Sequence, residues 1–362
     1  MNNKRTLIIA EAGVNHNGDI ELAKKLIDIA VESGADVVKF QTFKANKLAS
    51  KFAIQADYQI KNTGNCESQV QMLERLELKY EDHFELIQYC SKLGIEFLST
   101  AFDSESLNFL VNELKLNKLK IPSGDLTNAP LILEHARTGC NLIVSTGMAN
   151  LAEIETALGV IAFGYINCKD KKPSIENFEK AYYSELGKKL LKEKVTILHC
   201  TTEYPAPIND INLKAMNTIA NAFKLPVGYS DHSLGINVSI AAVARGAQII
   251  EKHFTLDQNM DGPDHKASLE PEQLKAMVEG IRNVELALGD GVKGPRPSEI
   301  QNINIARKSI VAAKDIDEGH VFTENCINIK RPGGGISPLK YWDLIGTKAN
   351  KGLESHVYGD GG

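Results

Sequence analysis

The sequence predicts an α/β protein built as a TIM (β/α)8 barrel with a small second domain. Eight short apolar runs rich in β-branched residues are separated by segments that mostly carry a helical pattern. Strands that alternate with helices form a parallel sheet, and eight such units close into a barrel. The chain has 362 residues, which exceeds the roughly 250 residues of a typical barrel and leaves room for the second domain.

The eight expected strands are residues 7–10, 36–40, 95–99, 118–121, 142–145, 195–199, 227–230 and 248–252. Residues 20–33 place apolar side chains at helical spacing and are followed by Gly34, which predicts the first crossover helix. Residues 80–93 and 236–244 repeat this pattern. An open doubly wound sheet is the alternative, but no GxGxxG motif lies near the first strand to favour it.

The residue pattern changes after residue 288, where glycines and prolines interrupt the alternation of strands and helices. This change predicts a barrel domain over residues 1–288. Residues 289–308 are rich in glycine and proline at their start and are expected to form a linker. Short strands at 309–313 and 326–329 predict a small, mainly β domain over 309–351, followed by an atypical polar tail at 352–362. Within the barrel, residues 163–194 form a charged insertion expected to be surface helix or loop.

Composition narrows the class of protein. Hydrophobic residues make up 43% and charged residues 24% of the chain, values typical of a globular protein with a sizeable core. The net charge of −5 and the lack of a basic stripe argue against nucleic acid and membranes as partners. The six cysteines include no CxxC pair and are expected to be free thiols. With no signal-peptide core visible, we expect a cytoplasmic protein.

Polar side chains occur at the end of every expected strand, where active sites of TIM barrels are built. These residues are Glu11, Asn15, His16, Lys39, Gln41, Ser99, Thr100, Lys120, Ser123, Asp125, Ser145, Thr146, His199, Thr201, Tyr204, Ser230, Asp231, His232, Glu251 and His253. A single polar residue at a strand end carries little information. Eight consecutive strands with this feature indicate a functional site.

His232 and His253 are separated by 253 − 232 = 21 residues and follow adjacent strands, seven and eight. Two neutral imidazoles in this arrangement can share one divalent metal ion and leave coordination positions for substrate oxygens and water. The alternative is that each histidine only makes structural hydrogen bonds.

Lys39 and Lys120 end strands two and four, so their ammonium groups can reach one shared mouth. They suit a phosphate or carboxylate, to which Ser123, Ser145 and Ser230 can add hydroxyl hydrogen bonds. Two alternatives stay open: each lysine reaches solvent or pairs with a carboxylate, or one of them forms a Schiff base.

Glu11 follows an apolar run, and burial there would raise its pKa and make proton transfer near neutral pH feasible. The alternative is a structural pairing of this carboxylate with a lysine.

Together these segments resemble the N-acylneuraminate synthase family, whose bacterial branch makes sialic or legionaminic acid. The motifs that carry the resemblance are IAEAGVNHNGD (9–19), VVKFQTFKA (37–45), KIPSGD (120–125), STGM (145–148), LHCTTEYPAP (198–207), YSDHS (229–233), EKHFT (251–255), GPDHKAS (262–268) and KRPGGGIS (330–337). They occur in order over almost the whole chain. Legionaminate is slightly favoured over N-acetylneuraminate, because TLIIAEAGVNHNGD and HKASLEP are more typical of that branch.

The resemblance implies that phosphoenolpyruvate and an open-chain N-acyl mannosamine-type sugar meet across Mn²⁺ or Mg²⁺. His232 and His253 match the metal ligands, and Glu11 matches the catalytic carboxylate. The family's phosphoenolpyruvate-binding residues match Lys39, Lys120, Ser123, Ser145 and Ser230, and its sugar contacts match Gln41, Tyr204 and Asp264. In this reaction carbon three of phosphoenolpyruvate attacks the aldehyde, water adds at carbon two, and phosphate leaves with C–O cleavage.

The small domain resembles the antifreeze-like (SAF) domain of these synthases, which reaches the partner's barrel in a domain-swapped homodimer. Arg331 then matches an arginine that contacts the N-acyl group, although the same side chain would also suit a solvated turn. Two departures from the family stand out: Asp125 replaces a common glutamate that belongs to the sugar site, and residues 352–362 lack the usual apolar last strand.

Other functions remain open from the sequence. One is a phosphoenolpyruvate-dependent synthase that uses an aldose phosphate, another is a Schiff-base sialate lyase working through Lys39 or Lys120, and a third is a non-catalytic binding protein.

Overall fold

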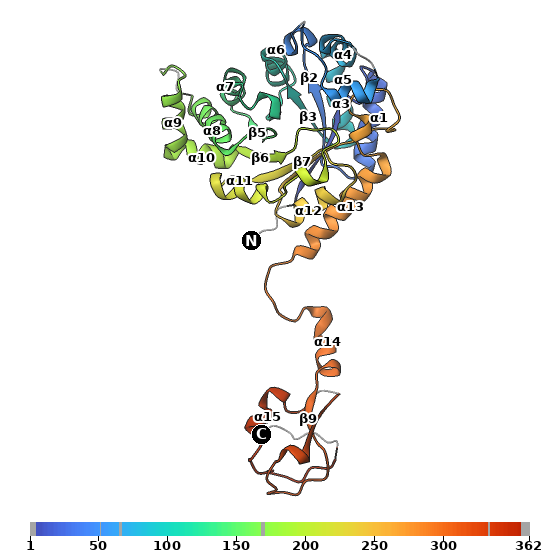
Figure 1. Cartoon of the computed structure of the whole chain (residues 1–362), viewed down its shortest axis with the longest axis vertical. Helices are drawn as coiled ribbons and strands as arrows, with labels where there is room; N and C mark the ends of the chain where they lie inside the picture. The colour runs from blue at the N-terminus through green and yellow to red at the C-terminus, as the bar shows by residue number, and fades with distance from the viewer. Residues whose placement is uncertain (1–4, 51, 65–66, 168–170, 332–333, 356–362) are drawn as a thin grey trace. The chain divides into compact units, whose positions relative to one another are not determined.

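The computed structural model describes residues 5–50, 52–64, 67–167, 171–331 and 334–355 (Figure 1). The chain divides into two compact units, Met1–Gly289 and Asp290–Gly362.

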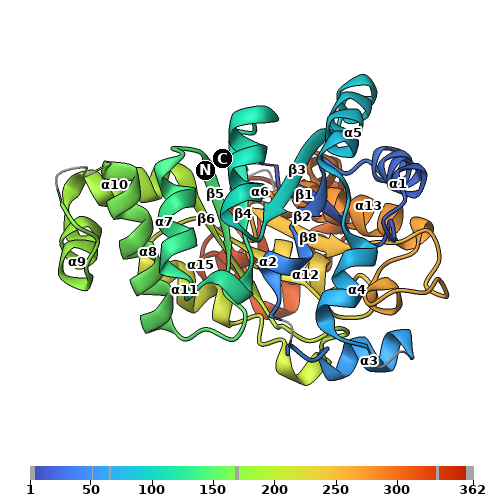
Figure 2. The same cartoon turned by 90° about the horizontal axis from the view of Figure 1, so that it is seen from above.

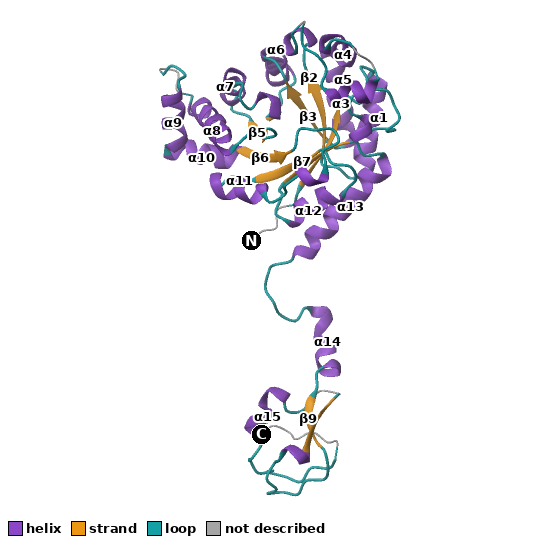
Figure 3. Cartoon of the chain, viewed as in Figure 1, coloured by secondary structure: helices purple, strands orange, loops and turns teal. Residues whose placement is uncertain are grey.

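The first unit is a closed barrel of eight parallel strands in sequence order, which confirms the predicted fold class. In Figure 3 the strands form the centre of this unit and the helices surround them. The strands are β1 (Leu7–Gly13), β2 (Val37–Thr42), β3 (Glu96–Ala101), β4 (Lys118–Ile121), β5 (Asn141–Ser145), β6 (Val195–Cys200), β7 (Val227–Asp231) and β8 (Ile249–His253). Several strands run one to three residues further than predicted, because pairing continues into the polar residues at their ends.

Helices fill the connections between the strands, as the apolar periodicity predicted. They are α1 (Ile20–Glu32), α2 (Ala45–Leu48), α3 (Asp57–Thr63), α4 (Gln69–Leu76), α5 (Tyr80–Leu93), α6 (Ser104–Asn108), α7 (Ala129–Arg137), α8 (Leu151–Ile166), α9 (Ile175–Tyr183), α10 (Glu185–Lys194), α11 (Ala215–Phe223), α12 (Asn237–Ala244) and α13 (Pro271–Leu288). The carboxylate of Asp19 caps α1 by accepting hydrogen bonds from the N–H groups of Glu21 and Leu22.

The predicted start of the charged insertion is wrong. Phe163 is 2% exposed and lies inside α8, which continues to Ile166. Its ring packs against Phe178 of α9, with the two ring centroids 5.3 Å apart. α9 lies beyond α8 in both views of the unit (Figure 2). The insertion therefore begins only after α8, because the apolar end of that helix is held by burial rather than exposed.

An apolar plug fills the interior of the barrel on the side of the strand starts. Its buried members are Ile9, Val37, Leu98, Ile143, Leu198 and Ile249. Because side chains alternate between the two faces of a strand, the residue two positions after each plug member also points inward. The plug thus forms the floor on which the next inward-facing layer rests.

The second unit contains the antiparallel pair β9 (Ser309–Ala312) and β10 (Ile327–Lys330). Isolated bridges join Ile316 to Leu353 and Val321 to Lys348. A small core includes Ile310, Phe322 and Cys326. Within this unit, pairing at Leu353 extends two residues beyond the predicted end of the small domain, while residues 356–362 of the predicted tail lie outside the described part.

The expected linker at 289–308 is not uniformly irregular. Residues Pro297–Ala306 form α14, and a short helix, α15, spans Tyr341–Leu344. Pro297 lies in the first turn of α14, where its missing N–H costs nothing, and the Glu299 carboxylate accepts a hydrogen bond of 2.9 Å from the N–H of Arg296. These local signals outweigh the glycines and prolines that precede them.

Cys90, Cys140, Cys200 and Cys326 are free and buried, whereas Cys66 and Cys168 lie outside the described residues. None of the helices in the described ranges has the length and apolar character needed to cross a bilayer.

Candidate active site

The inward face of the barrel changes from apolar to polar in a single step. Two residues beyond the plug, six strands present Glu11, Lys39, Thr100, Ser145, Cys200 and Glu251. β4 and β7 contribute Lys120 and Ser230 to the same region, as their contacts with Glu251 demonstrate. The polar layer therefore lies above the plug, toward the carboxyl ends of the strands, where sites of this fold are found.

Four charged groups form the centre of this layer. Lys39 Nζ lies 2.8 Å from Glu11 Oε2 and 3.6 Å from Glu251 Oε2. Lys120 Nζ lies 2.7 Å from Glu251 Oε1, which also accepts a hydrogen bond of 2.9 Å from Ser230 Oγ. All four charged residues are at most 5% exposed. The charges balance, two ammonium groups against two carboxylates, and Lys39 links the two carboxylates.

The pKa values of this cluster differ because the partners differ. Burial raises the pKa of Glu11 to about 7, since the opposing effect of Lys39 does not offset desolvation. Burial also acts against the charged form of Glu251, but Lys120 and Lys39 outweigh it and hold the pKa of Glu251 below its usual range. For Lys39, burial lowers the pKa, yet Glu11 and Glu251 raise it above its ordinary value. Glu11 is therefore the carboxyl group placed to exchange a proton near neutral pH.

His232 and His253 come together at the ends of β7 and β8, with ring centroids 5.9 Å apart. His232 Nδ1 lies 2.6 Å from the carbonyl oxygen of Thr201, so this nitrogen carries the proton and Nε2 keeps its lone pair, 3.4 Å from Ser230 Oγ. His253 Nδ1 is buried without a hydrogen-bond partner among the described residues. Burial lowers the pKa of His232 to about 4 and that of His253 well below its usual value, so both rings are neutral.

Close backbone approach makes room for His253. Gly13 adopts a φ of +54°, and a Cβ there would lie 3.1 Å from His253 Cε1 and 3.2 Å from its Nδ1. A side chain at this position would strain the backbone and crowd the imidazole. Gly13 is thus part of what lets the ring face the mouth of the barrel.

Tyr204 adds an aromatic wall next to the histidines. Its ring centroid lies 4.1 Å from that of His232 and 5.7 Å from that of His253. The ring of Tyr58 in α3 also packs against Tyr204, with the two centroids 5.1 Å apart. Burial among these groups raises the pKa of Tyr204 well above its ordinary value, so its hydroxyl remains a neutral donor.

The predicted serines surround a second part of the mouth. Ser123 Oγ accepts a hydrogen bond of 2.9 Å from the N–H of Gly147 and lies 3.1 Å from Cys200 Sγ. A Cβ at Gly147 would lie 2.1 Å from Thr202 Oγ1, so glycine is required for this close contact. Ser145 Oγ is buried and has no hydrogen-bond partner in the described part of the chain. These hydroxyl and N–H groups can receive an anionic ligand.

The remaining predicted residues are less closely joined to the cluster. Gln41 Nε2 donates a hydrogen bond of 3.4 Å to Glu11 Oε1. Asp125 follows β4 and accepts a hydrogen bond of 3.0 Å from Asn128 Nδ2, and burial raises its pKa. Burial also raises the pKa of Asp264, to about 6. Arg331 is exposed and directly follows β10 in the second unit.

Sequence reasoning did not assign a role to Glu251, which the structure places at the centre of the cluster. Thr100 and Cys200 were also left without a role, although Lys39 Nζ donates to Thr100 Oγ1 at 3.1 Å and Cys200 contacts Ser123. The signal was present in the chain: each lies two positions after a plug residue and so shares its inward face.

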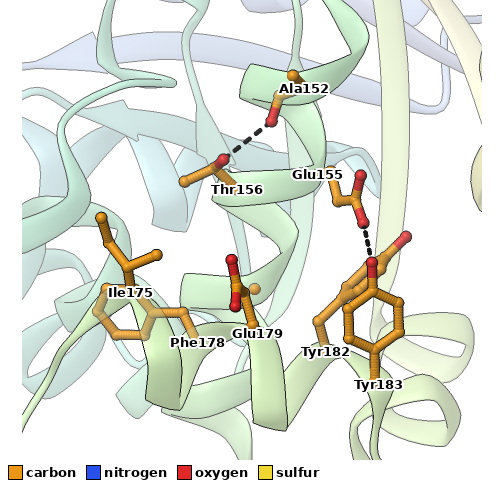
Figure 4. Close-up of a pocket in the computed structure, with 9 residues that line it drawn as sticks. Ala152, Glu155, Thr156, Ile175, Phe178, Glu179, Tyr182 and Tyr183 are labelled. Carbon is orange, nitrogen blue, oxygen red and sulfur yellow. Dashed lines mark hydrogen bonds between the residues drawn. The ribbon is translucent and has the colours of Figure 1, made fainter.

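A separate cavity of about 270 Å³ lies between α8 and α9 (Figure 4). Its lining includes Glu155, Glu179 and Phe178, and the hydroxyl of Tyr183 donates a hydrogen bond of 2.6 Å to Glu155. None of its lining residues belongs to the predicted site. The chemistry of the strand ends and this outer cavity are therefore distinct features.

The chain is similar in sequence to known proteins over most of its length. The sequence pattern that defines the NeuB family matches residues 26–293. The chain is 54% identical over 348 residues to the N,N'-diacetyllegionaminic acid synthase of Campylobacter jejuni subsp. jejuni serotype O:2, covering 96% of this chain and 97% of the relative. It is 44% identical over 348 residues to the N,N'-diacetyllegionaminic acid synthase of Legionella pneumophila, covering 96% and 91%.

A solved structure agrees with these sequence matches. The N-acetylneuraminic acid synthetase of Leptospira borgpetersenii, crystallised with citrate, superposes with a TM-score of 0.67 at 33% identity. The match covers 83% of this chain and 91% of that protein.

The charge cluster generates a stability prediction. Replacing Lys120 with Met leaves the Glu251 carboxylate buried without its nearest cation, so the free energy of unfolding should fall by roughly 3 kcal/mol in urea denaturation. Lys188→Met is the control, because Lys188 and Glu185 form a pair 3.4 Å apart in which both side chains are more than half exposed. That change should cost less than about 1 kcal/mol. Equal losses in the two variants would contradict the electrostatic account.

Proposed function

The chain belongs to the NeuB family, and on that premise we propose that it condenses phosphoenolpyruvate with an N-acyl mannosamine-type sugar to form a nonulosonate with release of phosphate. Among such sugars we propose 2,4-diacetamido-2,4,6-trideoxymannose, which yields legionaminate, in preference to N-acetylmannosamine, which yields N-acetylneuraminate. The two legionaminic acid synthases reported above support this choice. The observation that carries the proposal is the link that Ser230 makes between the histidines and the lysines. Its Oγ lies 3.4 Å from His232 Nε2 and 2.9 Å from the carboxylate of Glu251, which pairs with both Lys39 and Lys120.

The two lysines are suited to the anionic groups of phosphoenolpyruvate. In the free enzyme their ammonium groups pair with Glu11 and Glu251, and an incoming phosphate or carboxylate would share these cations. Ser123, Ser145 and Ser230 supply hydroxyl groups to the same ligand without adding charge. We assign the sugar contacts to Gln41, Tyr204, Asp125 and Asp264.

The histidine pair fits a divalent cation. Both rings are neutral, the proton of His232 is held by a backbone carbonyl, and His253 Nδ1 has no partner in the described ranges. No group of three or more His, Cys, Asp or Glu side chains suited to hold a metal ion occurs among the described residues, so substrate oxygens and water would complete the coordination. Bound Mn²⁺ or Mg²⁺ would supply Lewis-acid polarisation of the sugar aldehyde.

Glu11 is the proposed catalytic carboxylate. Its pKa of about 7 lets the ionised form accept a proton from the water that adds to carbon two. Carbon three attacks the aldehyde carbon and forms the C–C bond, which leaves an alkoxide on the former aldehyde oxygen and a cationic carbon two. Water adds at carbon two and gives a proton to Glu11, which passes it to the alkoxide. The C–O bond to phosphate then breaks in the tetrahedral species at carbon two; the bonding electrons leave with phosphate, which takes the remaining hydroxyl proton, and a carbonyl forms at carbon two.

The Schiff-base alternative is less well supported. A Schiff base needs a neutral amine, whereas Glu11 and Glu251 raise the pKa of Lys39 and stabilise its charged form. Lys120 Nζ forms an ion pair with Glu251 Oε1 at 2.7 Å. We therefore favour the synthase over the lyase. The aldose-phosphate synthase is disfavoured because the relatives at 54% and 44% identity are named for diacetyllegionaminic acid, a product without phosphate.

We further propose that the second unit is an antifreeze-like domain and that the protein forms a domain-swapped homodimer in the cytoplasm. In this arrangement the partner subunit's Arg331 contacts the N-acyl group of the sugar.

The reaction itself is tested by incubating the enzyme with phosphoenolpyruvate, Mn²⁺ and each sugar in turn. We expect kcat/KM to be at least roughly tenfold higher for 2,4-diacetamido-2,4,6-trideoxymannose, because its acetamido and methyl groups would find matching contacts. Phosphoenolpyruvate labelled with ¹⁸O at the bridging position should release labelled phosphate. A preference for N-acetylmannosamine would overturn the sugar assignment, and unlabelled phosphate would overturn C–O cleavage.

Metal dependence is tested by chelation. Activity should be lost after exhaustive treatment with EDTA and return when Mn²⁺ or Mg²⁺ is added. His253→Ala should not be rescued by the metal, while His135→Gln, a substitution at a buried histidine of α7 outside the site, should respond as the unmodified enzyme does. Full activity after chelation would exclude the metal assignment.

The pKa of Glu11 predicts a pH profile. Below pH 7 the carboxyl is protonated and cannot act as a base, so kcat/KM should rise with pH through a limb centred near pH 7. Glu11→Gln should abolish this limb and lower kcat by about 10² to 10⁴. The exposed Glu272→Gln is the control and should retain the limb. A limb that persists in Glu11→Gln would assign the titration to another group.

The role of Arg331 is tested by mixing inactive variants. Arg331→Ala should raise KM for the sugar more than KM for phosphoenolpyruvate. If the partner's arginine completes each site, subunits carrying Glu11→Gln mixed with subunits carrying Arg331→Ala should recover roughly a quarter of the activity, because half of the dimers are mixed and each has one intact site. No recovery after demonstrated subunit exchange would show that Arg331 does not act across the dimer.

A further inference from the structure

Behind the two histidines, on the outer face of the barrel, lies a buried ion pair. Asp231 and Lys252 are cross-strand partners at the last rung of the β7–β8 ladder. Their charged atoms, Lys252 Nζ and Asp231 Oδ2, are 3.2 Å apart, and both side chains are fully buried. Because side chains alternate along a strand, this pair faces away from the barrel interior, whereas the preceding rung, Ser230 and Glu251, faces inward.

The ion pair makes hydrogen bonds to the turn after β7 and to α12. Asp231 Oδ1 accepts hydrogen bonds from the N–H of Ser233 at 2.9 Å and from its hydroxyl at 2.6 Å, and Oδ2 accepts one of 2.7 Å from Ser239 of α12. Lys252 Nζ donates to the carbonyl oxygen of Ser233. Two charges thus join β7, β8, α12 and the turn that carries His232.

Each member of the ion pair directly precedes one of the two histidines in the sequence. His232 follows Asp231, and His253 follows Lys252. No β7–β8 pairing continues past this rung in the described ladder, so the ion pair is the last direct constraint between the two strands before the imidazoles. A buried ion pair is also a poor source of stability, since apolar residues of similar size are often as stable or more so. We therefore expect the ion pair to affect the positions of the two histidines more than the stability of the fold.

We infer that Asp231 and Lys252 are positioning residues that fix the separation of the His232 and His253 rings and thereby set the affinity for the divalent cation. The inference rests on the proposed metal centre. The positioning role is distinct from metal binding itself, because neither Asp231 nor Lys252 faces the site.

The decisive variant is the double substitution Asp231→Leu with Lys252→Met, which removes both charges and retains apolar volume. Its thermal midpoint should equal or exceed that of the unmodified protein. Its Mn²⁺ dissociation constant, measured by the loss of the free-ion EPR signal in a titration without substrate, should rise at least about tenfold. In kinetics, the Mn²⁺ concentration for half-maximal rate should rise, while kcat at saturating Mn²⁺ stays within about twofold.

A matched control comes from another ion pair of the barrel. Arg282 Nη2 lies 2.6 Å from Asp36 Oδ2 at the opposite end of the strands. The double substitution Asp36→Leu with Arg282→Met should change the thermal midpoint but leave the Mn²⁺ dissociation constant unaltered. Should Asp231→Leu with Lys252→Met fail to fold, Asp231→Asn keeps the acceptor oxygen, removes the charge, and should weaken Mn²⁺ binding severalfold.

The outcomes separate the inference from the proposed function. If His253→Ala abolishes Mn²⁺ binding but the folded Asp231/Lys252 variant, or Asp231→Asn in its place, binds Mn²⁺ like the unmodified protein, the positioning role is wrong and the metal centre stands. If His253→Ala binds Mn²⁺ unchanged, the metal centre is wrong and the positioning role falls with it. Weaker binding in the Asp36/Arg282 control as well would show a general loss of rigidity and overturn the specific role.

Discussion

The need to neutralise four charges inside the barrel governs the structure of this site. An isolated ammonium or carboxylate buried at this depth would lose several kcal/mol of solvation. Glu11, Lys39, Lys120 and Glu251 avoid that cost by pairing in a chain, with Ser230 satisfying a further lone pair. The strands that carry them must therefore keep their register, because a slip of one residue would turn each charge to the other face.

The same cluster serves both anion binding and proton transfer. Lys39 must stay charged in a water-poor site to receive an anion, and Glu11 and Glu251 raise its pKa and keep it charged. The carboxylates respond unequally. Glu251 is paired with both lysines and stays ionised, whereas Glu11 is paired with Lys39, which does not offset its burial, so its pKa lies near neutrality. One arrangement thus yields both a binding surface for anions and a group able to move a proton.

The corrections to the sequence predictions share a physical cause. Phe163 belongs to α8 because its ring is buried against Phe178, a contact made by a helix that follows in the chain. α14 forms within the expected linker because its first turn is capped locally. Glu251 belongs to the charge cluster because the fold brings it within 2.7 Å of Lys120, which is far away in the sequence. The family resemblance, in contrast, is confirmed over most of the chain by the sequence matches.

By itself, the sequence determined the eight strands, the closed α/β barrel and the identity of the polar residues at the strand ends, because alternation and helical periodicity are local properties of the chain. Tertiary structure decided which of those residues meet: the pairing of each lysine with a carboxylate, the neutral state of both imidazoles and the burial of Asp231 with Lys252. These depend on distances and desolvation, which arise only when strands remote in sequence close into a barrel.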